Sequence, residues 1–245
     1  MNVAKVTGWL AFGLVMGGGF HTTASAELAA GFQAALAAAE RPAEEKTRDA
    51  SRKPGEVLNF AGVEAGMTVL EAFAGGGWYT EALSAAVGSE GTIYAQNAAR
   101  MQERVGDAAA ARAARLGNVE VVYTESNDLG LPVQVDAAFT ALNLHDMANR
   151  GDEVGLGFLG GIFDALNPGG TLGMVDHVGV AGQDNAELHR MEVSKARELL
   201  MAAGFVIEAE SDILMNSADD HTLGIRDPAI RYNTDRMLIR ARKPE

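Results

Sequence analysis

Short apolar segments alternate with segments of helical apolar spacing along most of the chain. Seven β-branched or apolar runs predict strands, at about 68–71, 91–95, 119–123, 136–142, 171–177, 205–207 and 235–241. Apolar positions three or four residues apart predict helices at about 27–40, 78–88, 98–116, 153–166 and 186–203. Because helices separate most of the first five strands, the pattern predicts an α/β fold with a doubly wound, mostly parallel sheet.

Two segments depart from this alternation. Residues 41–54 are highly charged and contain Pro42 and Pro54, which predicts an exposed connector. Residues 211–234 predict a long polar loop, and a loop of that length inside a domain is usually functional or mobile. The chain is therefore expected to consist of a leader, 1–26, an N-terminal helix and connector, 27–54, and one domain, 55–245.

The first 26 residues have the composition of a secretory signal. Lys5 precedes an uncharged run from Val6 to Phe20, and Ala24-Ser25-Ala26 provides the small residues of a signal-peptidase site. The run is short and glycine-rich compared with the roughly 20 apolar residues of a membrane span. We therefore expect cleavage after Ala26, export, in a bacterium to the periplasm, and no stable membrane span afterwards.

Composition excludes several classes of function. The 245 residues contain no cysteine, so disulfides, thiolate metal sites and cysteine nucleophiles are excluded. The formal net charge of −13 argues against a nucleic-acid partner, because phosphate binding needs a basic face. We expect a small-molecule substrate, and the sequence indicates no oligomeric state.

A glycine-rich turn follows the first predicted strand. Val69 and Leu70 belong to that strand, Gly75-Gly76-Gly77 form the turn, and Trp78 begins a helix. Glycines let a ligand lie against the backbone, and the first N–H groups of the helix favour anionic ligand groups. This arrangement predicts a nucleotide-type pocket, although a ligand-free turn is the alternative. Thr80 stands where a dinucleotide-binding motif has its third glycine, so a nicotinamide-dependent oxidoreductase is a weak candidate.

The acid before this turn carries a resemblance. Glu71 ends the strand, and Gly75 and Gly77 follow it with the spacing of an acid-x-G-x-G-x-G motif in which Phe73 replaces the first glycine. The segment resembles the first motif of the class I, Rossmann-like S-adenosylmethionine-dependent methyltransferases. Residues 166–177, from Leu166 through Pro168 to His177, resemble another segment of that superfamily. The resemblance implies a seven-stranded sheet whose last strand is antiparallel.

Residues 48–244 also resemble a family of exported bacterial predicted methyltransferases. The motifs that carry this resemblance are Arg48–Leu58, Gly75–Glu81, His145-Asp146, Asp176-His177, His189–Val193, Ala203–Phe205 and Arg231–Arg236. It implies a fold and S-adenosylmethionine as cofactor, and it indicates no methyl acceptor.

The resemblance also implies a set of cofactor-binding residues. Gln96 and Asn97 stand where relatives have an acid that binds the ribose hydroxyls, and Glu125 and Asp128 stand on the adenine side. An acidic loop there is alternatively a solvated turn. The expected cofactor-binding residues are Glu71, Ala72, Phe73, Gly75, Gly77, Gln96, Asn97, Glu125, Asp128 and Asn143.

Two histidines are the candidate catalytic residues. His145 follows the fourth predicted strand and His177 ends the fifth, so both are expected at the carboxyl edge of the sheet, where open α/β sheets bind ligands. An imidazole there can take a proton from a methyl acceptor. Alternatively, His145 caps the next helix and the Asp176-His177 pair anchors a loop. The sequence lacks metal-ligand spacing such as H-x-x-x-H, so we predict no metal site.

Two functions remain open at this point. The leading hypothesis is methyl transfer from S-adenosylmethionine to a small molecule, aligned by the pocket and assisted by a base. The alternative is an exported, non-catalytic ligand-binding protein that retains the fold. Phe73, Gln96 and Asn97 favour the alternative, as does export, because S-adenosylmethionine is a cytosolic metabolite.

Overall fold

The computed structural model describes residues 27–38, 40–125 and 127–245. The predicted signal peptide, 1–26, lies outside these residues, and its cleavage and the export that it implies stay predictions.

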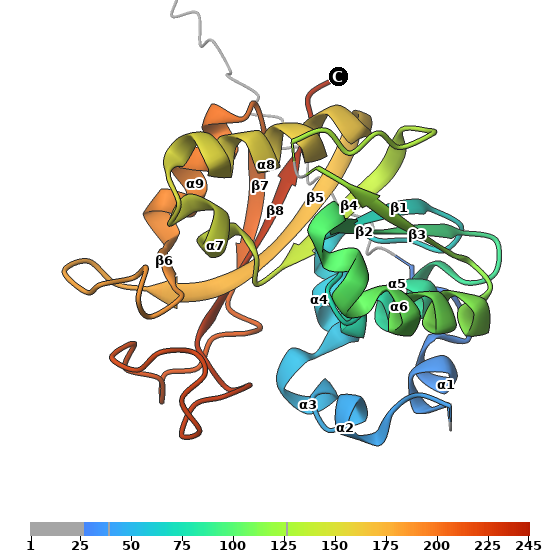
Figure 1. The fold of residues 1–245 in the computed structure, drawn as a ribbon, viewed down its shortest axis with the longest axis horizontal. Helices are drawn as coiled ribbons and strands as arrows, with labels where there is room; N and C mark the ends of the chain where they lie inside the picture. The colour runs from blue at the N-terminus through green and yellow to red at the C-terminus, as the bar shows by residue number, and fades with distance from the viewer. Residues whose placement is uncertain (1–26, 39, 126) are drawn as a thin grey trace, which may run out of the picture.

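One mixed sheet forms the centre of the fold (Figure 1). Its strands are β1 (Thr68–Ala72), β2 (Thr92–Ala98), β3 (Val119–Thr124), β4 (Val135–Ala141), β5 (Leu166–Gly179), β6 (Met191–Glu192), β7 (Val206–Ser211) and β8 (Arg236–Arg242). The order is β3-β2-β1-β4-β5-β8-β7, and the two-residue β6 pairs with β5 off this path. Only β8 runs antiparallel to its neighbours, β5 and β7. The predicted mostly parallel sheet with an antiparallel last strand is therefore confirmed.

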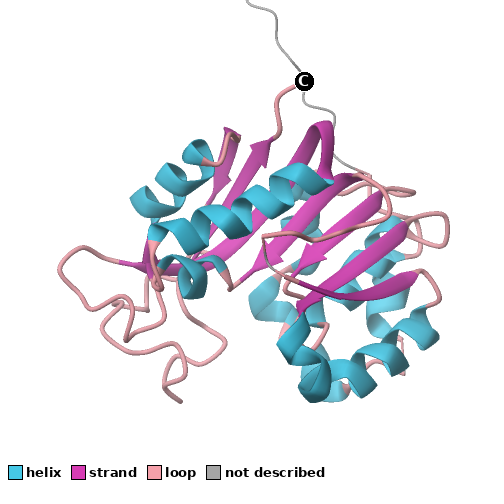
Figure 2. Ribbon diagram, turned by 45° about the horizontal axis from the view of Figure 1, so that its top comes forward, coloured by secondary structure: helices cyan, strands magenta, loops and turns pink. Residues whose placement is uncertain are grey.

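Helices cover both faces of the sheet (Figure 2). The α-helices are α1 (Phe32–Ala37), α2 (Ala43–Lys46), α3 (Asp49–Arg52), α4 (Pro54–Ala61), α5 (Trp78–Val87), α6 (Gln102–Leu116), α7 (Leu144–Ala148), α8 (Asp152–Ala165) and α9 (Val193–Ala202). One apolar core joins α1, α4 and α5 to the sheet, and the other joins α7, α8 and α9 to it.

Side-chain alternation in β1 sets the position of the predicted acid. Val69 belongs to the core beneath α5, whereas Leu70 and Ala72 belong to the core beneath α8. Because successive side chains of a strand point to opposite faces, Glu71 lies on the α5 face together with Val69.

Several predicted boundaries are wrong. The helix predicted at 186–203 begins at Val193, because Met191 and Glu192 pair with β5 and His189 has a φ of 54°. The helix predicted at 27–40 contains only Phe32–Ala37. The strand predicted at 171–177 begins earlier, at Leu166, and its pairing with β4 is irregular near this start.

The exposed connector predicted at 41–54 is also wrong. Its charged residues form the short helices α2 and α3, and Arg41 and Glu45 are only 2% and 9% exposed. Arg41 is buried because it forms a bidentate pair with the Asp49 carboxylate at 2.6 and 2.8 Å. Charge composition alone predicted solvent exposure, whereas the ion pair permits burial.

The long polar loop is confirmed between β7 and β8. All of residues 212–235 are described, and they contain neither helix nor strand. A buried Arg190–Asp219 pair, with two contacts of 2.9 Å, holds this loop to the segment before β6. Arg190 also donates to the carbonyls of Val178 and Leu223, so the loop lies against the carboxyl end of β5 (Figure 1).

In the described part of the chain, every helix falls short of the length or apolar character needed for a membrane span.

The close packing of α4 on β5 provides a test of the core. A Cβ at Gly173 would lie 2.5 Å from the Ala61 Cβ and 2.9 Å from the Phe139 ring. We predict that Gly173→Ala lowers the free energy of unfolding by about 1–3 kcal/mol through overpacking.

Gly160→Ala in α8 is the matched control, because its added Cβ would meet no heavy atom of the described chain within 4 Å. Urea denaturation should show this variant unchanged or more stable by up to about 1 kcal/mol. Equal stability of the two variants would contradict the packing of α4 against β5.

Candidate functional site

The loop between β1 and α5 forms the centre of the site. Phe73, which replaces the first glycine of the resembled motif, has a φ of 58°, in the left-handed region that normally favours glycine. Its ring packs edge-on against Phe158 of α8, with the ring centroids 5.3 Å apart. The aromatic side chain is therefore accommodated in the core beneath α8, while the backbone keeps a glycine-like path.

The end of β2 holds this loop in place. The Phe73 N–H donates to Gln96 Oε1 at 3.1 Å, and the Gly75 N–H donates to Asn97 Oδ1 at 2.8 Å. The Ala74 N–H donates to the Gln96 carbonyl at 2.8 Å. Both amide side chains are at most 1% exposed, and Gln96 Nε2 donates to Thr124. The residues expected at the ribose therefore hold the loop in this structure.

Glu71 lies buried beneath the first turn of α5. The Thr80 hydroxyl donates to Glu71 Oε2 at 2.5 Å, and the residue is 4% exposed. Burial raises the pKa of Glu71 to about 8, although the Thr80 hydrogen bond and the nearby charges of Arg112 and Arg52 act in the opposite direction. The role of Thr80 was not predicted, and its place in the first helical turn facing the strand end is the signal that indicates it.

A cavity of about 260 Å³ opens beside this acid. Three parts of the chain line it: the N-terminal helices, the glycine loop with the start of α5, and the segment after β4. The lining residues are Glu45, Arg48, Arg52, Glu71, Phe73, Ala74, Gly75, Gly76, Trp78, Tyr79, Ala141, Leu142 and Asn143. The segment predicted to be a connector therefore forms one wall of the site.

Aromatic residues of α5 contribute to the cavity wall. The Arg52 guanidinium lies 4.5 Å from the centroid of the Trp78 ring and 5.6 Å from that of Tyr79. The Tyr79 hydroxyl is buried, has no hydrogen-bond partner among the described residues, and has a pKa raised to about 12 by burial. A buried hydroxyl without a partner is unusual, so a ligand or water in the cavity is expected to bind it.

The glycine loop, with its open backbone at Gly75 and Gly76, fits an adenosyl cofactor. A Cβ at Gly75 or Gly76 would meet no heavy atom of the described chain within 4 Å, so the space beside both backbones is open. Glu71 supplies a carboxyl group at the same cavity. The volume is slightly below the roughly 300–1,000 Å³ of typical ligand pockets, so the cavity matches part of a nucleoside-sized ligand.

The remaining predicted cofactor residues lie in different environments. Asn143 lines the cavity, and its Nδ2 donates to the carbonyls of Phe73 and Ala141. The Ala72 carbonyl accepts a hydrogen bond from Thr140. Glu125 and Asp128 are exposed and form an isolated bridge with each other. The structure thus brings Glu71, Phe73, Gly75 and Asn143 together at the cavity.

The two candidate catalytic histidines lie at the carboxyl edge, near Asp176. His145 Nδ1 lies 2.6 Å from Asp176 Oδ1, and the His145 backbone N–H donates to Oδ2. Burial by itself lowers the pKa of His145, but the Asp176 charge and hydrogen bond outweigh it, so the pKa is raised. A histidine oriented by a buried carboxylate is suited to accept a proton.

His177 lies beside His145 at this edge. Its Nδ1 lies 2.7 Å from Thr234 Oγ1, and its ring centroid lies 5.6 Å from that of His145. Burial lowers the pKa of His177 to about 3, with the cations Arg236 and Arg190 adding to the effect and Asp176 opposing it. His177 is therefore neutral near pH 7.

His189 joins this edge but was not predicted as a site residue. Its Nδ1 lies 2.9 Å from Asp146 Oδ1, and its ring centroid is 5.9 Å from that of His145. In the sequence, α8 and β5 lie between His145 and His189, so spacing gave no sign of their proximity.

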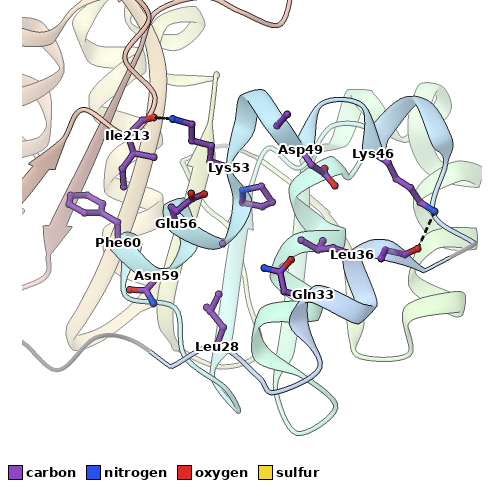
Figure 3. Close-up of a pocket in the computed structure, with 14 residues that line it drawn as sticks. Leu28, Gln33, Leu36, Lys46, Asp49, Lys53, Glu56, Asn59, Phe60 and Ile213 are labelled. Atoms are coloured by element: carbon purple, nitrogen blue, oxygen red, sulfur yellow. Dashed lines mark hydrogen bonds between the residues drawn. The ribbon is translucent and has the colours of Figure 1, made fainter.

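A larger hollow of about 1,170 Å³, drawn in Figure 3, is lined by neither Glu71 nor the histidines. Residues of α1 and α4 line it, together with Ile213, whose carbonyl accepts a hydrogen bond from Lys53 Nζ at 2.7 Å. Glu71 and the glycine loop belong to the smaller cavity. We place the candidate site at the smaller cavity because it contains the buried acid, the open glycines and the orphaned Tyr79 hydroxyl.

No protein-family model and no curated protein matches the chain. Solved structures do match it. A SAM-dependent methyltransferase from Aquifex aeolicus is 25% identical, with a TM-score of 0.58, and the match covers 81% of this chain and 96% of that one. A 1,6-didemethyltoxoflavin-N1-methyltransferase from Burkholderia thailandensis, with bound S-adenosylhomocysteine, is 19% identical, with a TM-score of 0.56, covering 82% and 80%.

The [4+2]-cyclase SpnF is 22% identical, with a TM-score of 0.58, covering 80% of this chain and 81% of that one. The chain has the class I, Rossmann-like fold of S-adenosylmethionine-dependent methyltransferases, and its solved neighbours include such methyltransferases. The prediction of a methyltransferase-type enzyme agrees with these neighbours.

The burial of Glu71 predicts how the free energy of unfolding depends on pH. Because the folded protein holds the Glu71 proton up to about pH 8 and the unfolded chain releases it near its ordinary pKa of 4.5, stability falls as the pH rises through this window. Glu71→Gln mimics the protonated acid. We predict similar stability for both proteins at about pH 5, and a variant more stable by about 3–5 kcal/mol at about pH 8.5.

Urea denaturation at the two pH values measures this difference. Glu120→Gln on β3 changes the same chemical group at an exposed position and should leave the pH dependence as in the wild type. A Glu71→Gln variant with the wild-type pH dependence would show that Glu71 ionises normally in the folded protein.

Proposed function

We propose that this protein transfers a methyl group from S-adenosylmethionine to a small-molecule acceptor. One observation carries the proposal: a buried carboxyl group, Glu71, and two open glycines, Gly75 and Gly76, meet at one cavity beside the first turn of α5. The chain shares its fold with methyltransferases that use the same cofactor.

The cofactor would lie along residues 73–77. Gly75 and Gly76 would let it approach the backbone, and Tyr79 would donate its free hydroxyl hydrogen. Glu71 would provide a negative charge near the cationic cofactor when it ionises, above about pH 8. Gln96 and Asn97 act on the cofactor indirectly, because they fix the loop backbone. The predicted roles of Glu125 and Asp128 at the adenine stay proposals, since both residues are exposed.

The methyl acceptor would bind at the histidine edge, which is the carboxyl edge of the sheet that carries His145, His177 and His189. S-adenosylmethionine supplies an electrophilic methyl group, so the protein contributes alignment and removal of a proton from the acceptor. His145 is the candidate base because Asp176 orients its ring, and His177 is a neutral polar neighbour. An oxygen or nitrogen of a small molecule is the acceptor that such a base suits.

A ligand-binding protein without catalysis is the second candidate. It is favoured by the 260 Å³ cavity and by the engagement of both β2 amide side chains in holding the loop. The similarity to SpnF, a cyclase, shows that this fold also occurs in proteins named for other reactions. Export to the periplasm, proposed from the composition of residues 1–26, would favour this candidate further, because it would separate the protein from cytosolic S-adenosylmethionine.

Cofactor binding can be measured by calorimetry with S-adenosylmethionine and S-adenosylhomocysteine. We predict that the wild-type protein binds both, and that the sulfonium cation of S-adenosylmethionine binds more tightly as the pH rises through about 8 and Glu71 ionises. Glu71→Gln should lose this rise and bind S-adenosylmethionine at least about tenfold more weakly at about pH 9, a difference of roughly 1.4 kcal/mol.

S-adenosylhomocysteine, which lacks the sulfonium charge, should show the smaller pH effect, and Glu120→Gln should behave as the wild type. An absence of heat and of thermal shift with either ligand at about 1 mM would reject the proposal. Mass spectrometry of small molecules that co-purify would then identify what a non-catalytic protein binds.

A further inference from the structure

We propose that His145, Asp146 and His189 form a binding site for one divalent transition-metal ion of the zinc class. The first two residues belong to α7, and His189 lies in the turn before β6. The site adjoins the proposed acceptor side, but it rests on its own geometry and not on cofactor binding.

The three side chains already lie close together. One candidate ligand atom from each residue can be chosen so that all three lie within 4.8 Å of one another. Asp146 Oδ1 lies 3.4 Å from His145 Nε2 and 2.9 Å from His189 Nδ1. Ligands of a tetrahedral zinc ion with bonds of 2.0–2.1 Å lie about 3.4 Å apart, so small side-chain rotations would complete the coordination.

The His145 ring is presented as a metal ligand. Its Nδ1 lies 2.6 Å from the Asp176 carboxylate, so in the neutral ring Nδ1 carries the hydrogen and the Nε2 lone pair is directed away from Asp176. His145 is 1% exposed, and Nε2 has no hydrogen-bond partner in the described part of the chain. Histidine ligands of metals commonly donate their other ring N–H to such a carboxylate.

Charge also favours a cation at this position. In the neutral tautomer, the Nε2 lone pair and the Asp146 carboxylate face each other 3.4 Å apart and repel, so a proton or a metal ion between them is stabilising. Asp146 and Asp176 both place a carboxylate oxygen near the His145 ring, so the cluster carries two negative charges.

The strained backbone conformation at His189 independently supports a functional role for its side chain. Its φ is 54°, which is unfavourable for a residue with a Cβ and clusters at functional sites. Arg190, the next residue, is fully buried in its pair with Asp219, so the turn that presents His189 is anchored.

The donor set selects the class of ion. Two imidazoles and one carboxylate suit zinc, cobalt, nickel or ferrous iron, whereas magnesium and calcium prefer oxygen ligands alone. Three protein ligands leave at least one position open, as in catalytic metal sites. A bound ion would occupy the Nε2 lone pair of His145. It would instead lower the pKa of a coordinated acceptor hydroxyl, whose proton would pass to water.

Calorimetric titration of the chelator-treated protein with zinc or cobalt chloride tests the site. We predict one equivalent of either ion, no comparable binding of magnesium or calcium, and cobalt absorption bands typical of tetrahedral coordination. His189→Asn removes one ligand and tolerates the positive φ, so it should weaken binding at least about 100-fold. Asp176→Asn, which alters the support of His145, should weaken it about 10–100-fold.

His221→Asn is the matched control. His221 also has a positive φ, 64°, and its Nε2 also lies 2.9 Å from an aspartate, Asp235. It is not one of the three proposed metal ligands. This variant should keep wild-type metal affinity. Absence of zinc and cobalt binding in the wild type, or equal loss in both histidine variants, would overturn the proposal. Both outcomes leave cofactor calorimetry unaffected, so failure of the metal site is distinguishable from failure of the methyltransferase proposal.

Discussion

The burial of Glu71 at the end of β1 is the constraint on which the site depends. A carboxyl group in the α5-side core requires a partner, and the Thr80 hydroxyl provides it at 2.5 Å. This contact joins the end of the strand to the first turn of the helix. The loop between them is then held by the Gln96 and Asn97 side chains from the neighbouring strand. Parallel pairing of β1 with β2 and β4 thus places an acid, an open glycine cradle and the Asn143 segment at one edge.

Residues 48–52 and 232–236, far apart in the sequence, meet beside this edge. Arg52 of α3 stacks on Trp78, and Arg236 of β8 donates to the Ser51 carbonyl. Arg48 lies 5.1 Å from the centroid of the Tyr232 ring. The motifs at 48–58 and 231–236 therefore contact each other, and Arg48 and Arg52 of the first motif line the cavity. Asn143 of the cavity and His145 of the candidate metal site both belong to the segment that follows β4, so one sheet edge carries both sites.

Much of the fold was predictable because burial on both faces makes the central strands recognisable in sequence. The acid and glycines of the loop were predictable for a related reason, since strand-to-helix turns with open backbones need those residue types. The functions of Gln96 and Asn97 were not, because residue type does not reveal whether an amide faces a ligand or a neighbouring loop. The proximity of His189 to His145 arises from pairing of β6 with β5, which the helical pattern at 186–203 concealed. The burial of Arg41 and Glu45 likewise depends on ion pairs formed only in the folded chain.

The central claim is that the open backbone beside Glu71 is the binding surface for the adenosyl cofactor. A crystal structure of the protein grown with S-adenosylhomocysteine tests it most directly. The account predicts ligand density along residues 73–77, in contact with the open side of Gly75 and Gly76, with the Thr80 hydroxyl still bonded to Glu71. Density in the larger hollow lined by α1 and α4, or an unchanged empty loop at saturating ligand, would contradict it.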